Sequence, residues 1–104
     1  MWQNAEICFA VDDPTAAGDF PGHPIIPGAL LLEEIVRAIA GTEALARGLV
    51  IPAVKFLAPV HPGEVVRLRW RSREDKQISF EGRLGDGGER LAVAGMLRLG
   101  SAAP

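Results

Sequence analysis

Residues 19 to 34 read DFPGHPIIPGALLLEE. The first half is rich in proline and glycine, carries an acid, Asp19, and a histidine, His23, and is typical of a loop. The second half opens at Pro27-Gly28 and continues into leucines and two glutamates. Proline is tolerated in the first turn of a helix, because its missing N–H would have no partner there. The stretch therefore predicts a loop with acid–base groups that leads into an apolar helix.

The predicted helix runs from Gly28 to about Ala40, a length of about 20 Å. Its side chains are apolar on nearly all sides, so we expect a long, apolar central helix that is buried on most sides. Glu33 and Arg37 stand four residues apart on one face and are expected to pair. Gly41 predicts the end of the helix, and residues 42–47 either extend it or start a short second one.

Five segments have the apolar content and alternation typical of strands. They are residues 6–11, 50–56, 64–72, 77–84 and 90–99. The clearest alternation is in 64–72, where Val66, Leu68 and Trp70 are predicted to face the core and the arginines between them to face water. The glycine-rich residues 85–88 predict a hairpin turn, because glycine adopts positive φ without strain. We expect the four strands after the helix to pair in chain order, as a meander.

One apolar helix wrapped by an antiparallel sheet of about five strands satisfies both the helix and the one-sided strands. The sequence therefore predicts an α+β domain with the hot-dog fold, and residues 1–104 are expected to form this single domain. A hydrophobic content of 48% with 23% charged residues is normal for a globular protein. So short a chain with so apolar a helix favours association with a second subunit.

Charge and cysteine content exclude several classes of function. A net charge of −2 argues against a nucleic-acid partner, which needs a basic face. The single cysteine, Cys8, excludes an internal disulfide and a cysteine-based zinc site, and fits a reducing cytoplasm. No apolar run is long enough for a membrane span, and no signal peptide is expected. We therefore expect a cytoplasmic protein.

Two motifs carry a resemblance to a known family. Residues 18–33 resemble the active-site segment of the 3-hydroxyacyl-[acyl-carrier-protein] dehydratases, which reads Gly-His-Phe-Pro-Gly-x-Pro-x-x-Pro-Gly-x-Leu-x-x-Glu. Residues 54–64, VKFLAPVHPGE, are similar to that family's strand and turn ending in Pro-Val-x-Pro-Gly-Asp. With the glycine-rich hairpin and the last strand, the resemblance spans nearly the whole chain.

The resemblance implies a homodimer that eliminates water from 3-hydroxyacyl thioesters in fatty-acid or related biosynthesis. Each site would combine the loop of one subunit with the helix of the other, and would use no metal and no cofactor. The substrate would arrive on acyl carrier protein or coenzyme A. Carried over by position, Glu33 protonates the departing hydroxyl, and helix N–H groups hold the thioester carbonyl. The implied substrate-binding residues are Phe20, Pro27, Gly28, Ala29 and Leu30.

Position 19 departs from the family pattern, because it holds Asp19 where the family has its catalytic histidine. Aspartate has a reference pKa near 3.9 against about 6.5 for histidine, and is therefore the weaker base. Arg37 also stands where the family has a glutamine, and its charge would keep Glu33 ionised.

Four alternatives remain open at this point. In the first, His23 replaces the missing histidine, and the competing interpretation of His23 is a loop residue that simply faces solvent. In the second, Asp19 and His23 act together, as in (R)-specific enoyl hydratases. In the third, Asp19 shares a proton with Glu33. In the fourth, the chain is a non-catalytic acyl-binding subunit or the heterodimer partner of a histidine-bearing paralogue. A thioesterase on the same fold, with a carboxylate that activates water, is a further alternative.

Other residues have plainer interpretations. His61, in a turn flanked by prolines, is expected to be exposed, and Cys8 is expected in the core. The arginines at 67, 69, 71 and 73 either dock an acidic carrier protein or form a solvated outer face of the sheet.

Overall fold

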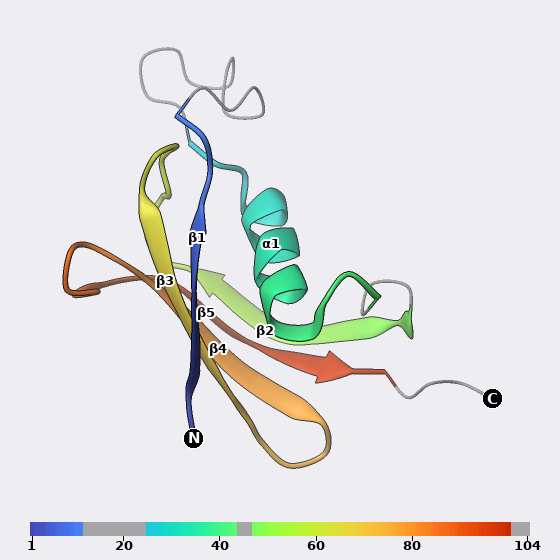
Figure 1. Cartoon of the computed structure of the whole chain (residues 1–104). Coiled ribbons are helices and arrows are strands. Elements are labelled where there is room, and N and C mark those ends of the chain that lie inside the picture. The colour runs from blue at the N-terminus through green and yellow to red at the C-terminus, as the bar shows by residue number, and fades with distance from the viewer. Residues whose placement is uncertain (12–24, 44–46, 101–104) are drawn as a thin grey trace.

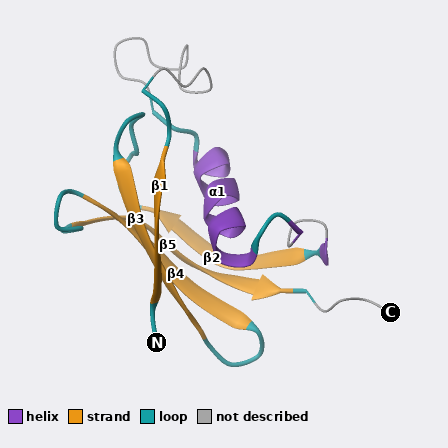
Figure 2. Ribbon diagram, in the orientation of Figure 1, coloured by secondary structure: helices purple, strands orange, loops and turns teal. Residues whose placement is uncertain are grey.

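One helix lies against one face of a five-stranded sheet. The computed structural model describes residues 1–11, 25–43 and 47–100. Its elements are β1 (Gln3–Cys8), α1 (Gly28–Ala40), β2 (Leu49–Phe56), β3 (Val65–Ser72), β4 (Gln77–Leu84) and β5 (Arg90–Leu99). Figures 1 and 2 show α1 on one side of the curved sheet. The predicted α+β composition is confirmed, and α1, β4 and β5 have the predicted bounds.

The strand order corrects the predicted meander. All neighbouring strands are antiparallel, in the order β1-β3-β4-β5-β2. Only β3, β4 and β5 pair in chain order, whereas β2 lies beside β5 at the far edge. The connection after β2 explains this. The backbone N–H groups of Leu57 and Ala58 both donate to the Ala92 carbonyl, at 2.7 and 3.2 Å, so the chain stays on β5 before it crosses to β3.

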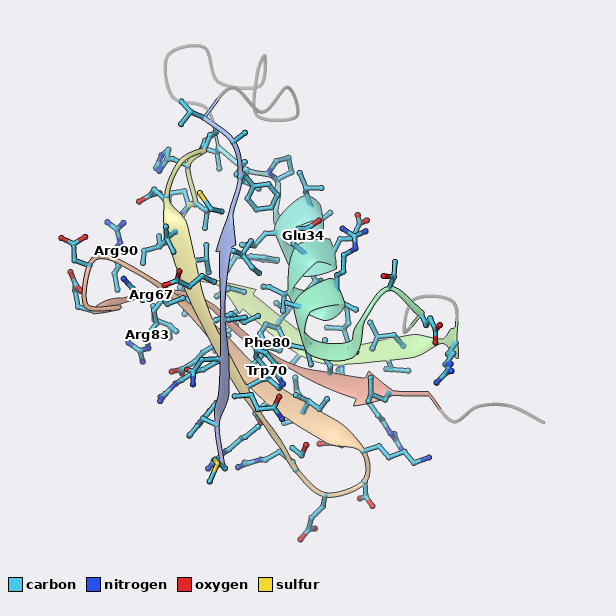
Figure 3. The ribbon with its side chains drawn as sticks, viewed as in Figure 1. Glu34, Arg67, Trp70, Phe80, Arg83 and Arg90 are labelled. Atoms are coloured by element: carbon cyan, nitrogen blue, oxygen red, sulfur yellow. The ribbon has the colours of Figure 1, made fainter. Side chains whose placement is uncertain are left out.

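The core lies between α1 and the inner face of the sheet. In β3 the predicted alternation is confirmed, because Val66, Leu68 and Trp70 are all buried. Trp70 is the register partner of Phe80 in β4, and both lie beneath the helix (Figure 3). Each large side chain buried in this way contributes about 1.5 to 3 kcal/mol to folding. The inner face of the sheet is therefore the main source of stability.

The helix is less enclosed than the sequence indicated. It has 13 residues, and only Leu31, Ile35 and Val36 are buried. Ala29, Glu33 and Ala38 are exposed, and the other leucines are half-buried. The expectation of a long helix buried on most sides is therefore wrong for the single chain. A sheet can cover only one side of a helix, so the opposite side of α1 stays open.

The first strand begins and ends earlier than predicted. It covers Gln3–Cys8 instead of 6–11 and pairs with β3 from Gln3 opposite Trp70 to Cys8 opposite Val65. Beyond this ladder, Val11 is 79% exposed. The strand ends where its partner begins, so pairing overrides the alternation that suggested a longer strand. Cys8 is exposed, which corrects its expected place in the core.

Candidate functional site

The N-terminus of α1 presents backbone hydrogen-bond donors. Pro27 precedes the helix, and its carbonyl accepts from the N–H groups of Leu30 and Leu31 at 3.1 and 3.0 Å. Pro27 supplies no side-chain cap at this end. Within residues 25–43 and the other described ranges, the N–H groups of Gly28 and Ala29 have no backbone acceptor. A helix N-terminus with free N–H groups favours a negatively charged ligand atom, because the helix dipole adds to the donors.

An aromatic ring lies beside these donors. The ring of Phe56, the last residue of β2, is so close to Gly28 that a Cβ atom built there would lie 3.1 Å from Cζ. The same Cβ would lie 3.3 Å from each Cε atom, so the far end of the ring points at the start of the helix. The sequence analysis missed Phe56. Its signal was Gly28 itself, because glycine at the start of a helix often marks the close approach of another group.

The β2–β3 connection holds the start of α1 in place. The backbone N–H of Ile26 donates to the carbonyl of Val60 at 2.8 Å. In the same connection, the N–H of Gly63 donates to the carbonyl of Phe9 at 2.8 Å. Phe9 and Ile26 lie on either side of residues 12–24. One connection therefore fixes the two points at which the chain enters and leaves that segment.

Glu33 lies on the open side of α1. Its side chain is 47% exposed, and one carboxylate oxygen is 3.0 Å from Nη2 of Arg37. The predicted pair is therefore confirmed, and its exposure explains how so apolar a helix accommodates a carboxylate. Arg37 also contacts the carboxylate of Glu34 through Nη1, which the sequence analysis missed. One guanidinium thus holds two neighbouring carboxylates.

The described residues contain part of the predicted site. Pro27, Gly28, Ala29 and Leu30 lie together at the start of α1, and Glu33 lies just over one turn further along. Asp19, Phe20 and His23 lie outside the described residues, so their roles stay predictions. The N-terminal end of α1 is therefore the part of the site that the structure defines.

His61 belongs to a separate cluster on the β2–β3 connection. Its side chain is 45% exposed, and its backbone N–H and Nδ1 lie 2.9 and 3.0 Å from one oxygen of Glu64. The other oxygen of Glu64 is 3.3 Å from Arg90. Burial raises the pKa of Glu64, but the hydrogen bonds from His61 and the charge of Arg90 outweigh it and hold that pKa below 4.5. This cluster fastens the turn to β5.

The arginines of β3 face outward, as predicted. Arg67 pairs with Glu6 of β1 at 2.8 Å, and Arg69 shares Glu81 of β4 with Arg83. Figure 3 shows Arg67, Arg83 and Arg90 on one side of the molecule, away from Glu34 on the helix.

Trp2 covers part of this outer face. The guanidinium carbons of Arg69 and Arg71 lie 4.3 and 4.9 Å from the centre of its ring. Paired carboxylates and an aromatic ring account for these arginines, which favours the interpretation as an outer face exposed to water.

The described residues hold neither a cluster of metal-binding side chains nor a membrane-spanning helix. In residues 1–11, 25–43 and 47–100, no three His, Cys, Asp or Glu side chains come together as a metal site would require. Over the same ranges, no helix is long and apolar enough to cross a membrane.

The arrangement of helix and strands identifies a known fold, and a family comparison identifies the class of protein. The packing of α1 on five antiparallel strands in this order is that of the hot-dog fold. The family model of the ApeI-like proteins, described as ApeI dehydratase, matches residues 3–94. The chain therefore belongs to the ApeI-like dehydratase family.

Curated relatives are 3-hydroxyacyl-[acyl-carrier-protein] dehydratases. The protein of Rhizorhabdus wittichii is 34% identical over 89 residues, which are 74% of this chain and 57% of the relative. That of Roseiflexus castenholzii is 40% identical over 73 residues, or 59% of this chain and 48% of the relative. The chain thus spans about half the length of these curated relatives.

Solved structures support the fold. A chain of the dehydratase heterocomplex ApeI:P from Xenorhabdus doucetiae has a TM-score of 0.71 at 20% identity, over 96% of this chain and 88% of that one. An acyl-CoA hydrolase from Staphylococcus aureus has a TM-score of 0.58 at 16% identity, over 94% of this chain and 62% of that one. At these identities the likeness concerns the fold alone.

Proposed function

We propose that this protein removes water from 3-hydroxyacyl thioesters carried on the pantetheine arm of acyl carrier protein or coenzyme A. The observation that carries this proposal is the open N-terminus of α1, where Gly28 and Ala29 offer N–H groups without a backbone acceptor among the described residues. Membership of a dehydratase family over residues 3–94 supports the same reaction. The single free cysteine fits the proposed setting, the cytoplasm.

The thioester carbonyl would bind at the start of the helix. Its oxygen gains negative charge when the proton on C2 leaves, and two N–H groups with the helix dipole stabilise that charge. The C–H electron pair moves into the C2–C3 bond, and the hydroxyl leaves C3. That hydroxyl departs as water once an acid has protonated it. The products are a 2-enoyl thioester and water.

Two side chains have the proton-transfer roles in this proposal. Glu33 gives its proton to the leaving hydroxyl, and Asp19 takes the proton from C2, with His23 as the alternative base. Asp19 is the weaker base by its reference pKa, so it needs the proximity of a second carboxylate or burial to raise that pKa. Glu33 in turn must leave its pair with Arg37 and carry a proton, as it would in a dyad that shares one proton with Asp19, when the substrate binds.

The proposed active form is a dimer. In the single chain, Glu33 lies on the open side of α1, the edge strand β2 exposes Val50, and Leu57 just after it is exposed as well. An apolar edge strand next to an open helix favours pairing with a second chain. Each site would then combine the loop of one copy with Glu33 on the helix of the other.

A second candidate function is that of a non-catalytic acyl-binding partner subunit. The observation in its favour is the Arg37 guanidinium, which holds both Glu33 and Glu34. The position of the family's catalytic histidine also holds Asp19 in this chain. The solved neighbour from Xenorhabdus doucetiae is described as a heterocomplex, which makes a partner subunit a concrete alternative.

One assay separates these candidates. Purified protein is given a 3-hydroxyacyl pantetheine thioester, and the reaction is followed by enoyl absorbance and by free thiol. A dehydratase raises the absorbance, a thioesterase releases thiol, and a binding subunit does neither but retains the thioester in calorimetry.

A matched pair of variants tests the acid. Glu33→Gln is expected to lower kcat at least a hundredfold, because the proton donor is lost. Glu34→Gln, which removes the neighbouring carboxylate on the same arginine, is expected to retain activity. Equal activity in both variants would remove Glu33 from the mechanism.

A further inference from the structure

The proposed reaction gives Phe56 no role, although its ring lies against Gly28 at the start of α1. The ring end would lie within 3.1 to 3.3 Å of a Cβ atom on Gly28. Along a helix, Cα–Cβ bonds tilt toward the N-terminus. The ring of Phe56 lies on the side of Gly28, the first helical residue, to which a Cβ atom would point. It therefore lies beside the N-terminal end of α1, where the backbone N–H groups begin.

The ring is held by the backbone and not by burial. Phe56 ends β2 opposite Val93 of β5, and the next N–H, that of Leu57, donates to the Ala92 carbonyl at 2.7 Å. These contacts fix its Cα, while 49% of the residue stays exposed in the single chain. A half-exposed phenylalanine so close to a glycine is well placed to contact a bound molecule.

The position of the ring relates it to one carbon of the substrate. A thioester oxygen that accepts from the N–H of Gly28 would lie about 2.9 Å from that nitrogen. C2 of the acyl group is two bonds from this oxygen, and our proposal places it on the side of Gly28 that the ring end borders. The hydrogens at the ring edge are also slightly positive, which suits a neighbouring oxyanion.

We propose that Phe56 is the specificity-determining residue for C2 of the acyl thioester. It accepts straight-chain 3-hydroxyacyl groups and excludes those with a methyl branch at C2. This inference rests on the proposed dehydration. A 2-methyl-3-hydroxyacyl thioester still has one proton on C2, so its chemistry is possible and only the fit is affected.

The test compares two substrates. These are the pantetheine thioesters of 3-hydroxyhexanoic acid and 2-methyl-3-hydroxyhexanoic acid. The wild type is expected to prefer the straight chain by at least about tenfold in kcat/KM, the range that one methyl group gives in a shaped pocket. Phe56→Ala is expected to reduce this preference to less than about threefold, mainly through faster turnover of the branched substrate.

Control variants separate this role from a structural one. Val65→Ala truncates another exposed apolar side chain, on β3, and should keep the wild-type preference. Phe56→Leu, which keeps an apolar side chain, should give an intermediate preference. Thermal unfolding and sedimentation show whether each variant folds and assembles as the wild type does.

Each outcome decides one proposal. A wild type that converts both substrates equally, or a Phe56→Ala variant that keeps the preference, overturns the role of Phe56 and leaves the dehydration standing. A wild type that converts neither substrate overturns the dehydration. In that case calorimetry with hexanoyl and 2-methylhexanoyl pantetheine thioesters still tests Phe56, because binding requires no turnover. Equal affinities of the wild type for the two, or no binding of either, overturn its role.

Discussion

The two edges of the sheet are built from different residues. On β1 the exposed side chains include Gln3, Asn4 and Glu6, and Glu6 pairs with Arg67 on the neighbouring strand. On β2 and just after it, the exposed side chains include Val50, Phe56 and Leu57. A polar edge suits water, whereas an apolar edge next to an open helix suits another chain. This difference is the reason why we propose β2 as the edge for contact with a second subunit.

The β2 edge is also interrupted. Its register with β5 shifts between Val50 and Ala53, and Pro52 lies in that gap. Proline has no N–H to donate, so a second strand could form a regular ladder only with the part of β2 that follows it. We therefore expect a short backbone contact, supplemented by apolar side chains.

The largest effect is expected when charge is placed on the β2 edge. Val50→Glu combined with Leu57→Glu should weaken self-association at least a hundredfold, because two carboxylates would be buried without partners. Analytical ultracentrifugation measures the change. The matched variant Asn4→Glu on β1 should leave the mass unchanged. A double variant that remains dimeric would show that β2 is not the interface.

A second, smaller effect concerns the attachment of β2 to the sheet. A Cβ atom at Gly95 would lie 2.6 Å from the carbonyl oxygen of Ala53 and 2.8 Å from the Phe80 ring. Gly95→Ala should therefore lower the free energy of unfolding by about 1 to 3 kcal/mol, the usual effect of overpacking. Hydrogen exchange should show reduced protection of the backbone amides in β2 and unchanged protection in β1. Equal loss at both edges would contradict this local account.

A third effect is a dependence of stability on pH at the β2–β3 connection. Folding lowers the pKa of Glu64, so the ionised carboxylate stabilises the folded state at pH values above its pKa in the unfolded chain. This stabilisation is lost as the pH falls below 4.5 and through the pKa in the folded state. Unfolding by urea at several pH values should show the decline. Glu64→Gln should flatten the curve of unfolding free energy against pH. The contribution of Glu64 to stability is less than about 1 kcal/mol, because solvent screens the cluster. A curve that keeps its slope in the variant would assign the effect to other groups, among them Glu81, whose pKa is also lowered.

The smallest effect is expected on the β1 edge. Arg67→Ala removes the pair with Glu6, in which both side chains are about half exposed. Such pairs contribute less than about 1 kcal/mol, so urea unfolding should barely change. A loss of several kcal/mol would mean that β1 is held by this pair and not by its ladder with β3.

Much of the fold could be predicted, because strands with one buried face carry a strong alternation. Val66, Leu68 and Trp70 indicated both the extent and the inward face of β3, and the glycines indicated the β4–β5 hairpin. The neighbour of β2 could not be predicted, since alternation reveals a strand but not its partner. The early end of β1 has the same cause, because it depends on where β3 begins.

The site divides in the same way. Local spacing predicted the helix start at Gly28 and the pairing of Glu33 with Arg37, four residues away. Phe56 was missed, because its contact with Gly28 joins residues 28 positions apart and leaves no local pattern. The resemblance supplied the roles of Asp19, Phe20 and His23, and these three residues lie outside the described ranges.

The two hydrogen bonds from the β2–β3 connection have a consequence for how such a protein evolves. They hold Phe9 and Ile26, the flanks of residues 12–24, through backbone atoms alone. These two hydrogen bonds therefore involve no side chain of that segment. Under this arrangement a histidine at position 19 can be exchanged for an aspartate while the helix start keeps its anchor. Catalytic side chains can then change during evolution while the fold is retained.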